Sequence, residues 1–410
     1  LASFEVGGPL NEMGKNYFSL PELIKETFSF EAFDKIQDLA TAQNTLVNLK
    51  GSENLLTVQA MGLELQTAVG KGTPFNIGEA EPFYQMPKEF NFKPYKPTFQ
   101  GASYYEATNL KAGVFEYEGK RIGFLRIPSY QIRDLVSANL GLKGIIKYLN
   151  ENSDVLLIDQ TSNPGGMVMY SDMIIKGLVG EIRRDSHMRF AFRPGRSIIS
   201  TFQFLQNQLN SLQDIPELVG LKSKYDTAIE TELSALTEAF ANDERLTRPV
   251  SLSIVSELMI DMLEAPLKVK MTQTEDGKLM RETLKAALGF DPIGDYKYED
   301  SKPIIMMINE LDISGGDATP AVLQDYGRVK MVGVNTAGAG GSVGQFGHDL
   351  RNQFSFTATQ SLMIRKDGGL VENIGVAPDI DFQLKKSDVT EQFVNVLPRL
   401  MQTLKDHKAL

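Results

Sequence analysis

The sequence predicts an α/β fold in which a helix-covered sheet is interrupted by a helical insertion. Continuous apolar runs at residues 155–159 and 304–309 are typical of strands that are buried on both faces. Each run leads into a small-residue loop and then a helical pattern, as in a β-α-β unit. From about 196 to 300 only helical spacing recurs, which indicates the insertion.

The first part of the chain divides into three segments. Residues 1–70 are expected to form a small module, with helical patterns at 21–28 and 30–39 and a short strand at 55–60. Residues 71–112 are rich in Pro, Gly, Lys and aromatic residues, which breaks long elements and indicates a connecting segment. The core, residues 113–195 and 301–410, begins with a predicted hairpin at 114–128, whose turn is at Gly119.

Further elements of the core follow from local patterns. Helical spacing predicts helices at 138–149, from about Ser171, and at 389–404. A strand is predicted at 329–334, and alternating residues from 354 to 364 indicate antiparallel strands. The insertion at 196–300 therefore separates two halves of one predicted sheet.

Composition excludes several classes of function. The 410 residues are 42% apolar and 23% charged, which is ordinary for two or three globular domains. A net charge of −10 would repel a phosphate backbone, so we do not expect a nucleic-acid partner. There is no cysteine, and hence no disulfide or thiol nucleophile. No run of 18 apolar residues occurs, so we expect no membrane span, and because the sequence opens with Leu1 we expect residues upstream.

Ser314 lies where the predicted strand 304–309 turns into a helix. Unpaired N–H groups in the first turn of a helix stabilise a negative oxygen, so this is a suitable place for an acyl-transfer nucleophile. The alternative needs no chemistry: Ser314 and Asp317 form the S-x-x-D pattern of a helix capping box.

Other candidate residues are weaker when taken singly. The Gly165–Gly166 pair could turn N–H groups toward a ligand or could simply permit a tight turn. The Gly-rich run at 336–342 lacks the G-K-[ST] ending of a phosphate loop. Three scattered histidines, His187, His348 and His407, lack metal-ligand spacing, so we expect no metal and no cofactor.

Taken in order, several segments resemble the tail-specific serine protease family, whose catalytic core is crotonase-like. The segments are 123–130, 157–166, 308–317, 336–341 and 372–378. The resemblance implies a crotonase/ClpP-like βαβ spiral and a partial PDZ-like module in residues 1–70. It also implies a nucleophile at Ser314, a supporting carboxylate at Glu372, and an oxyanion hole formed by the N–H groups of Gly315, Gly165 and Gly166.

The chain departs from the family at one position. Many members have a lysine base where this chain has Ala339, which excludes a Ser/Lys dyad built on that motif. The resemblance then implies a histidine base upstream of Leu1. It further implies peptide or protein substrates, a homodimer, association with an upstream fragment, and a secreted or periplasmic location.

Two functions from different classes remain open. One is a serine endopeptidase; the other is a catalytically silent relative that acts as a peptide-binding or assembly module. A serine without a base is a poor nucleophile, so the upstream histidine distinguishes them. A third possible function is that of a crotonase-type acyl-CoA enzyme, but the serine at the start of the helix argues against it.

Overall fold

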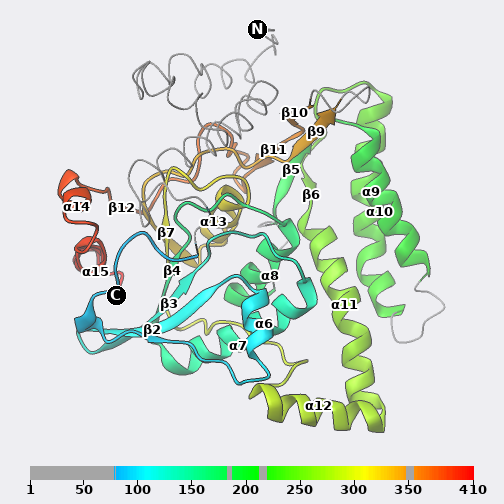
Figure 1. Ribbon diagram of the computed structural model, residues 1–410. Helices are drawn as coiled ribbons and strands as arrows, with labels where there is room; N and C mark the ends of the chain where they lie inside the picture. The colour runs from blue at the N-terminus through cyan, green and yellow to red at the C-terminus, as the bar shows by residue number, and fades with distance from the viewer. Residues whose placement is uncertain (1–77, 79, 182–186, 212–218, 348–354) are drawn as a thin grey trace.

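The computed structural model describes residues 78, 80–181, 187–211, 219–347 and 355–410 (Figure 1). The elements predicted within residues 1–70 lie outside the described residues. None of the described helices is both long enough and apolar enough to cross a membrane.

A seven-stranded sheet forms the centre of the described part. Its spatial order is β1-β2-β3-β4-β7-β8-β12, with β1 to β3 antiparallel and β3 to β12 parallel to their neighbours. The strands are β1 (Lys93–Pro94), β2 (Lys111–Tyr117), β3 (Lys120–Arg126), β4 (Val155–Asp159), β7 (Ile304–Ile308), β8 (Val329–Gly333) and β12 (Ile380–Asp381). The predicted β2–β3 hairpin is confirmed, and Gly119 supplies the positive φ of 79° at its turn.

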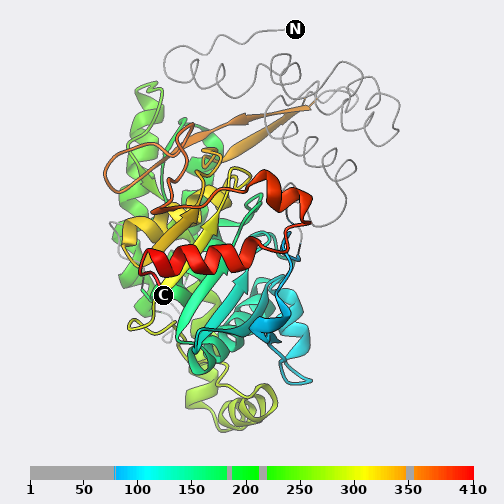
Figure 2. The same ribbon diagram turned by 90° about the vertical axis from the view of Figure 1, so that its left-hand side faces the viewer.

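Both faces of this sheet are buried, which explains the continuous apolar runs. In β4, Leu156 and Ile158 belong to one core, whereas Val155 and Leu157 belong to the core on the opposite face. The first core is covered by the helices α7 (Leu135–Asn152), α8 (Val168–Val179) and α13 (Gly315–Tyr326). The second is covered by α15 (Val396–Asp406), which Figure 2 shows in red across the strands.

The pattern of residues 196–300 predicted helices only, and the structure shows that this insertion also contains a strand. It contains α9 (Arg196–Ser211), α10 (Val219–Ala241), α11 (Ser253–Gln273) and α12 (Glu275–Leu288), which extend along one side in Figure 1. It also contains β6 (Val250–Ser251), which pairs with β5 (Arg189–Phe192); β5 in turn pairs with β11 (Ser361–Ile364). Two residues are too few to show a strand period. This small sheet ties the insertion to both halves of the core.

The remaining elements refine three predictions. The antiparallel strands expected from 354 to 364 are confirmed as β10 (Ser355–Thr359), which pairs with β9 (Val343–Gly347), and as β11. The helix predicted at 389–404 is instead α14 (Lys386–Thr390) and α15, because Gln392 and Phe393 have positive φ between them. The segment 71–112 contains the short η1 (Lys88–Phe90), α6 (Ala102–Ala107) and the edge strand β1.

Candidate active site

Ser314 has a backbone conformation that serine rarely adopts. It follows β7 and precedes α13, with φ 58° and ψ −114°. Its side chain makes no capping hydrogen bond, so the S-x-x-D pattern does not form a reciprocal capping box. A positive φ at a non-glycine residue costs about 1–3 kcal/mol and is concentrated at functional sites. The conformation leaves the half-buried side chain free of a structural task.

Backbone hydrogen bonds hold Ser314 in this conformation. Its N–H donates to the carbonyl oxygen of Ala339 (3.0 Å), and its own carbonyl accepts from the N–H groups of Asp317 (2.9 Å) and Ala318 (2.8 Å). Asp317 in turn accepts from Gly338 N–H (2.7 Å) and Ala339 N–H (2.9 Å). Helix α13 and the 336–341 segment therefore fix the serine from two sides.

The Gly165–Gly166 loop lies directly against the serine turn. Gly165 has φ 88° and Gly166 has φ 145°. A Cβ atom on Gly165 would lie 2.7 Å from the Ser314 Cβ and 2.6 Å from the Gly315 nitrogen, so no side chain fits there. Because β4 and β7 are parallel neighbours, their carboxyl ends bring the two motifs together.

The structure gives Gly165 a task different from the predicted one. Its N–H donates to Asn163 Oδ1 (2.8 Å) and is therefore not available to an oxyanion. Within the described part of the chain, the N–H groups of Gly166 and Gly315 have no acceptor. The Gly166 nitrogen lies 3.4 Å from the Cβ position of Gly315, and Gly166 is exposed. Two neighbouring N–H groups next to a serine are the donors that an oxyanion requires.

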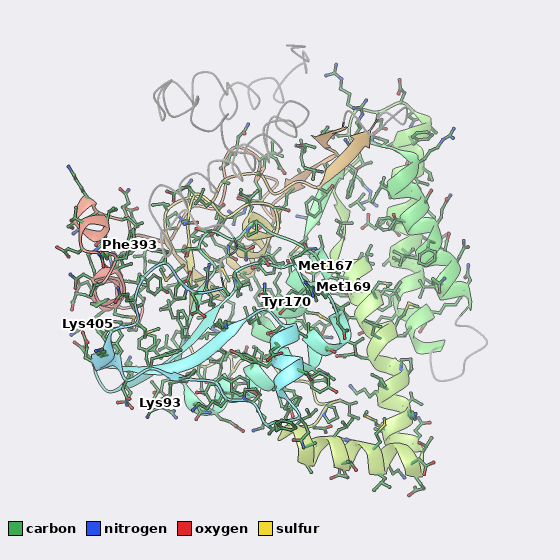
Figure 3. The ribbon with its side chains drawn as sticks, in the orientation of Figure 1. Lys93, Met167, Met169, Tyr170, Phe393 and Lys405 are labelled. Atoms are coloured by element: carbon green, nitrogen blue, oxygen red, sulfur yellow. The ribbon has the colours of Figure 1, made fainter. Side chains whose placement is uncertain are left out.

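Helix α8 begins immediately after this loop and anchors it to the core. Met167 N–H donates to the Tyr130 carbonyl (2.9 Å), and the buried Tyr170 hydroxyl donates to the Thr108 carbonyl (2.6 Å). Figure 3 labels Met167, Met169 and Tyr170 at this end of α8. The chain leaving Gly166 is thus fixed by contacts to two other segments, which contain Tyr130 and Thr108.

Glu372 lies next to the 336–341 segment. The residue is 4% exposed, and its carboxylate accepts from Met363 N–H, with 2.9 Å to each oxygen. A Cβ on Gly341 would lie 2.8 Å from Glu372 Oε1, which explains the glycine. Burial raises the pKa of Glu372 to about 7, and the nearby Asp317 carboxylate contributes to the increase. Burial likewise raises the pKa of Asp317 to about 6.

The raised pKa of Glu372 predicts a pH-dependent stability. Between its ordinary pKa and about 7 the folded state holds a proton that the unfolded chain has lost, so rising pH destabilises the fold across that window. We expect the free energy of unfolding of the wild type to fall relative to Glu372→Gln by roughly 1.4 kcal/mol per pH unit there. Urea unfolding of both proteins at pH 5 and 7.5 measures this. A difference that does not change with pH would contradict the raised pKa.

The two described histidines, His187 and His407, contact residues other than Ser314. His187 is buried, with Nδ1 2.8 Å from Ser251 Oγ and Nε2 3.3 Å from a Glu257 oxygen. His407 is exposed and is the C-cap residue of α15. His348 lies outside the described residues. Within the described part of the chain, no cluster of histidine and carboxylate side chains could hold a metal ion.

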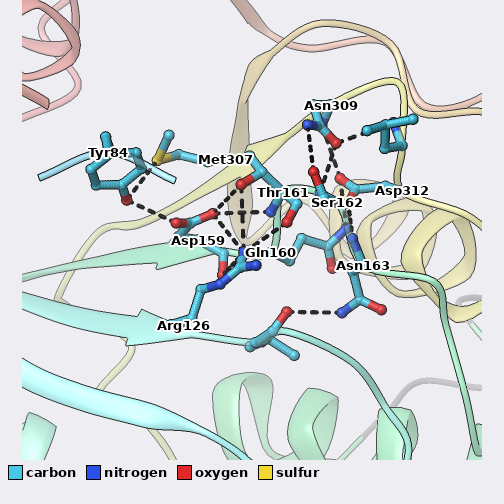
Figure 4. A network of polar contacts seen from close by, with 12 residues as sticks. Tyr84, Arg126, Asp159, Gln160, Thr161, Ser162, Asn163, Met307, Asn309 and Asp312 are labelled. Atoms are coloured by element: carbon cyan, nitrogen blue, oxygen red, sulfur yellow. Dashed lines mark hydrogen bonds and ion pairs between the residues drawn. The ribbon is translucent and has the colours of Figure 1, made fainter. Parts of the chain in front are cut away.

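A buried polar network beneath the two motifs was not predicted from the sequence. The Arg126–Asp159 ion pair (3.1 Å) is almost completely buried, and Asp159 also accepts from the Tyr84 hydroxyl (2.8 Å). Asp312 accepts from the N–H groups of Asn163 and Asn309, at 2.9 Å each. Figure 4 shows these groups linking the ends of β3, β4 and β7. The polar run that follows the apolar strand β4 was the available signal.

Comparison with known proteins identifies a family domain in part of the chain. Residues 253–382 match the model of peptidase family S41, a segment that includes Ser314 and Glu372. This chain carries a peptidase family S41 domain. The resemblance to tail-specific proteases is thereby confirmed. The S41 model does not extend to Gly165 and Gly166, which the fold brings to the same place.

Chlamydial proteins resemble this chain over most of its length. A Chlamydia pneumoniae protein is 30% identical over 302 residues, 71% of this chain and 45% of the relative. A protein of Chlamydia trachomatis serovar D is 29% identical over 291 residues, 68% and 44% of the two chains. The chain thus spans less than half the length of these relatives.

Two solved structures share the mixed α/β fold of this chain. The crystal structure of mature CPAF, the chlamydial protease-like activity factor, has a TM-score of 0.59 at 21% identity, covering 82% of this chain and 59% of CPAF. Mature CPAF complexed with lactacystin gives 0.58 at 21% identity, with 85% and 62% covered. The α/β prediction is confirmed at this level.

Proposed function

We propose that this protein is a serine endopeptidase whose nucleophile is Ser314. The observation that carries the proposal is the strained serine beside the N–H groups of Gly166 and Gly315, which have no acceptor within the described residues. Strain, small neighbours and paired donors together match the needs of acyl transfer, and none of them is needed for helix capping. The S41 domain supports the same chemistry.

The reaction would proceed through an acyl-enzyme. Ser314 Oγ attacks the peptide carbonyl carbon while its proton passes to a base, and the carbonyl oxygen becomes an oxyanion between the two N–H groups. The C–N bond then breaks as the base returns the proton to the leaving amine. Water attacks the ester by the same steps and releases the acid.

A histidine upstream of Leu1 is the base in this proposal, and Glu372 supports it. The described histidines, His187 and His407, contact Ser251 and the Thr403 carbonyl. Position 339 is alanine, whereas many family members have a lysine base there. A buried carboxylate with a pKa of about 7 can stabilise an imidazolium once it is ionised.

The proposal includes the architecture and setting that the family resemblance implies. We infer a crotonase-like core, a partial PDZ-like module in residues 1–70, protein or peptide substrates, and a homodimer that can retain its own upstream fragment. We also infer a secreted or periplasmic location. Light scattering of the full-length and the processed protein tests the dimer and the retained fragment.

Labelling with a fluorophosphonate probe tests the function. We expect modification of Ser314, located by peptide mapping, in the full-length protein and not in the 410-residue chain alone. Labelling elsewhere would contradict the assigned nucleophile. If neither folded form is labelled, the peptidase proposal is wrong and the alternative, a catalytically silent peptide-binding module, is favoured.

A further inference from the structure

The buried side chain of Asn163 holds the Gly165–Gly166 loop from within. Asn163 is 0% exposed. Its Oδ1 accepts from Gly165 N–H (2.8 Å), and its Nδ2 donates to the Ile127 carbonyl (2.9 Å) at the end of β3. Both the donor and the acceptor of the amide are therefore used, and they connect the glycine loop to the sheet.

The backbone of the same residue is bonded to the serine turn. Asn163 N–H donates to Asp312 Oδ1 (2.9 Å), and the Asn163 carbonyl accepts from Ile313 N–H (2.9 Å). A Cβ on Gly316 would lie 2.4 Å from that carbonyl oxygen, so the first turn of α13 packs against it. One residue thus contacts both halves of the candidate site.

We propose that Asn163 is the positioning residue of the oxyanion site. By binding Gly165 N–H it would fix the peptide that carries the next N–H, that of Gly166, whose nitrogen lies 3.4 Å from the Cβ position of Gly315. Without the amide, Gly165 N–H and the Ile127 carbonyl would lose their partners in a buried loop, and the loop would turn to satisfy them. This role rests on the proposed peptidase function.

The test uses the full-length protein and a fluorogenic peptide. We expect Asn163→Ala to lower kcat roughly 10²–10³-fold, as when one oxyanion donor is lost, with KM changed less than about threefold. A peptide aldehyde, whose adduct with Ser314 carries an oxyanion, should lose affinity by a similar factor, while a product peptide should not. Asn163→Asp keeps the acceptor for Gly165 N–H, and we expect it to recover part of kcat.

Asn309 supplies a matched control in the same network. It is also buried, and it accepts from Ser162 N–H (2.8 Å) and Leu311 N–H (3.2 Å), but it does not contact either glycine. We expect Asn309→Ala to lower Tm about as much as Asn163→Ala, with kcat within roughly fivefold of the wild type.

The outcomes separate the positioning role from the proposed function. If the wild type is active and both alanine variants lose kcat equally, the positioning role is wrong and the proposed peptidase function is unaffected. The same holds if Asn163→Ala lowers the affinities for the aldehyde and for the product peptide together. A wild type that neither cleaves the peptide nor reacts with the fluorophosphonate would overturn both.

Discussion

Replacing Ser314 by glycine is expected to abolish turnover and to stabilise the fold. Loss of the nucleophile should lower kcat roughly 10⁴-fold or more. Glycine adopts φ 58° without the penalty that serine bears, so we expect the free energy of unfolding to rise by about 1 kcal/mol after the greater freedom of the unfolded chain is counted. Peptide hydrolysis by the full-length protein and guanidinium unfolding measure the two effects.

Thr274 provides the control for this substitution. It precedes α12 with an ordinary φ of −100°, and its side chain accepts from Gly277 N–H (3.0 Å). Thr274→Gly removes a working cap and should lower the stability by several tenths of a kcal/mol, leaving turnover intact. If Ser314→Gly destabilises the protein as Thr274→Gly does, the strain at Ser314 is absent.

The Asp159→Asn variant is expected to show the largest loss of stability. Its carboxylate lies 3.1 Å from the guanidinium of Arg126, and neither side chain is more than 2% exposed. Removing one partner of a buried ion pair costs about 3–5 kcal/mol, because the remaining charge stays desolvated. Guanidinium unfolding of the variant and the wild type at neutral pH measures the difference.

An exposed pair on the same two strands is the control. Arg121, near the start of β3, lies 2.6 Å from Asp154, just before β4, and both side chains are nearly half exposed. We expect Asp154→Asn to cost less than about 1 kcal/mol, because water already solvates both charges. Equal losses at Asp159 and Asp154 would show that burial does not set the cost.

The strands and the serine turn were predictable because their causes are local. A strand buried on two faces must be apolar throughout, as β4 and β7 are, and a turn without room for side chains must be rich in glycine. The meeting of Gly165 with Ser314 was expected from the resemblance, and the parallel pairing of the two strands explains it.

The residues that hold the site could not be found in the same way. Asn163 and Asp312 stand in polar loops, where most such side chains are solvated, and their burial depends on strands far away in the sequence. The hydrogen bond from Gly165 N–H to Asn163 could not be predicted either, because a sequence motif identifies a glycine but not the direction of its N–H. The two-residue strand β6 was too short to leave a pattern.

The distance along the chain between the two halves of the site has a consequence for synthesis. In the network beneath the site, Ser162 and Asn309 are hydrogen-bonded although 147 residues separate them. At about 5–20 residues per second, a ribosome needs roughly 7–30 s to pass from one to the other. The two halves of the candidate site therefore cannot meet until most of this chain has emerged, so the proposed peptidase activity would arise only late in synthesis.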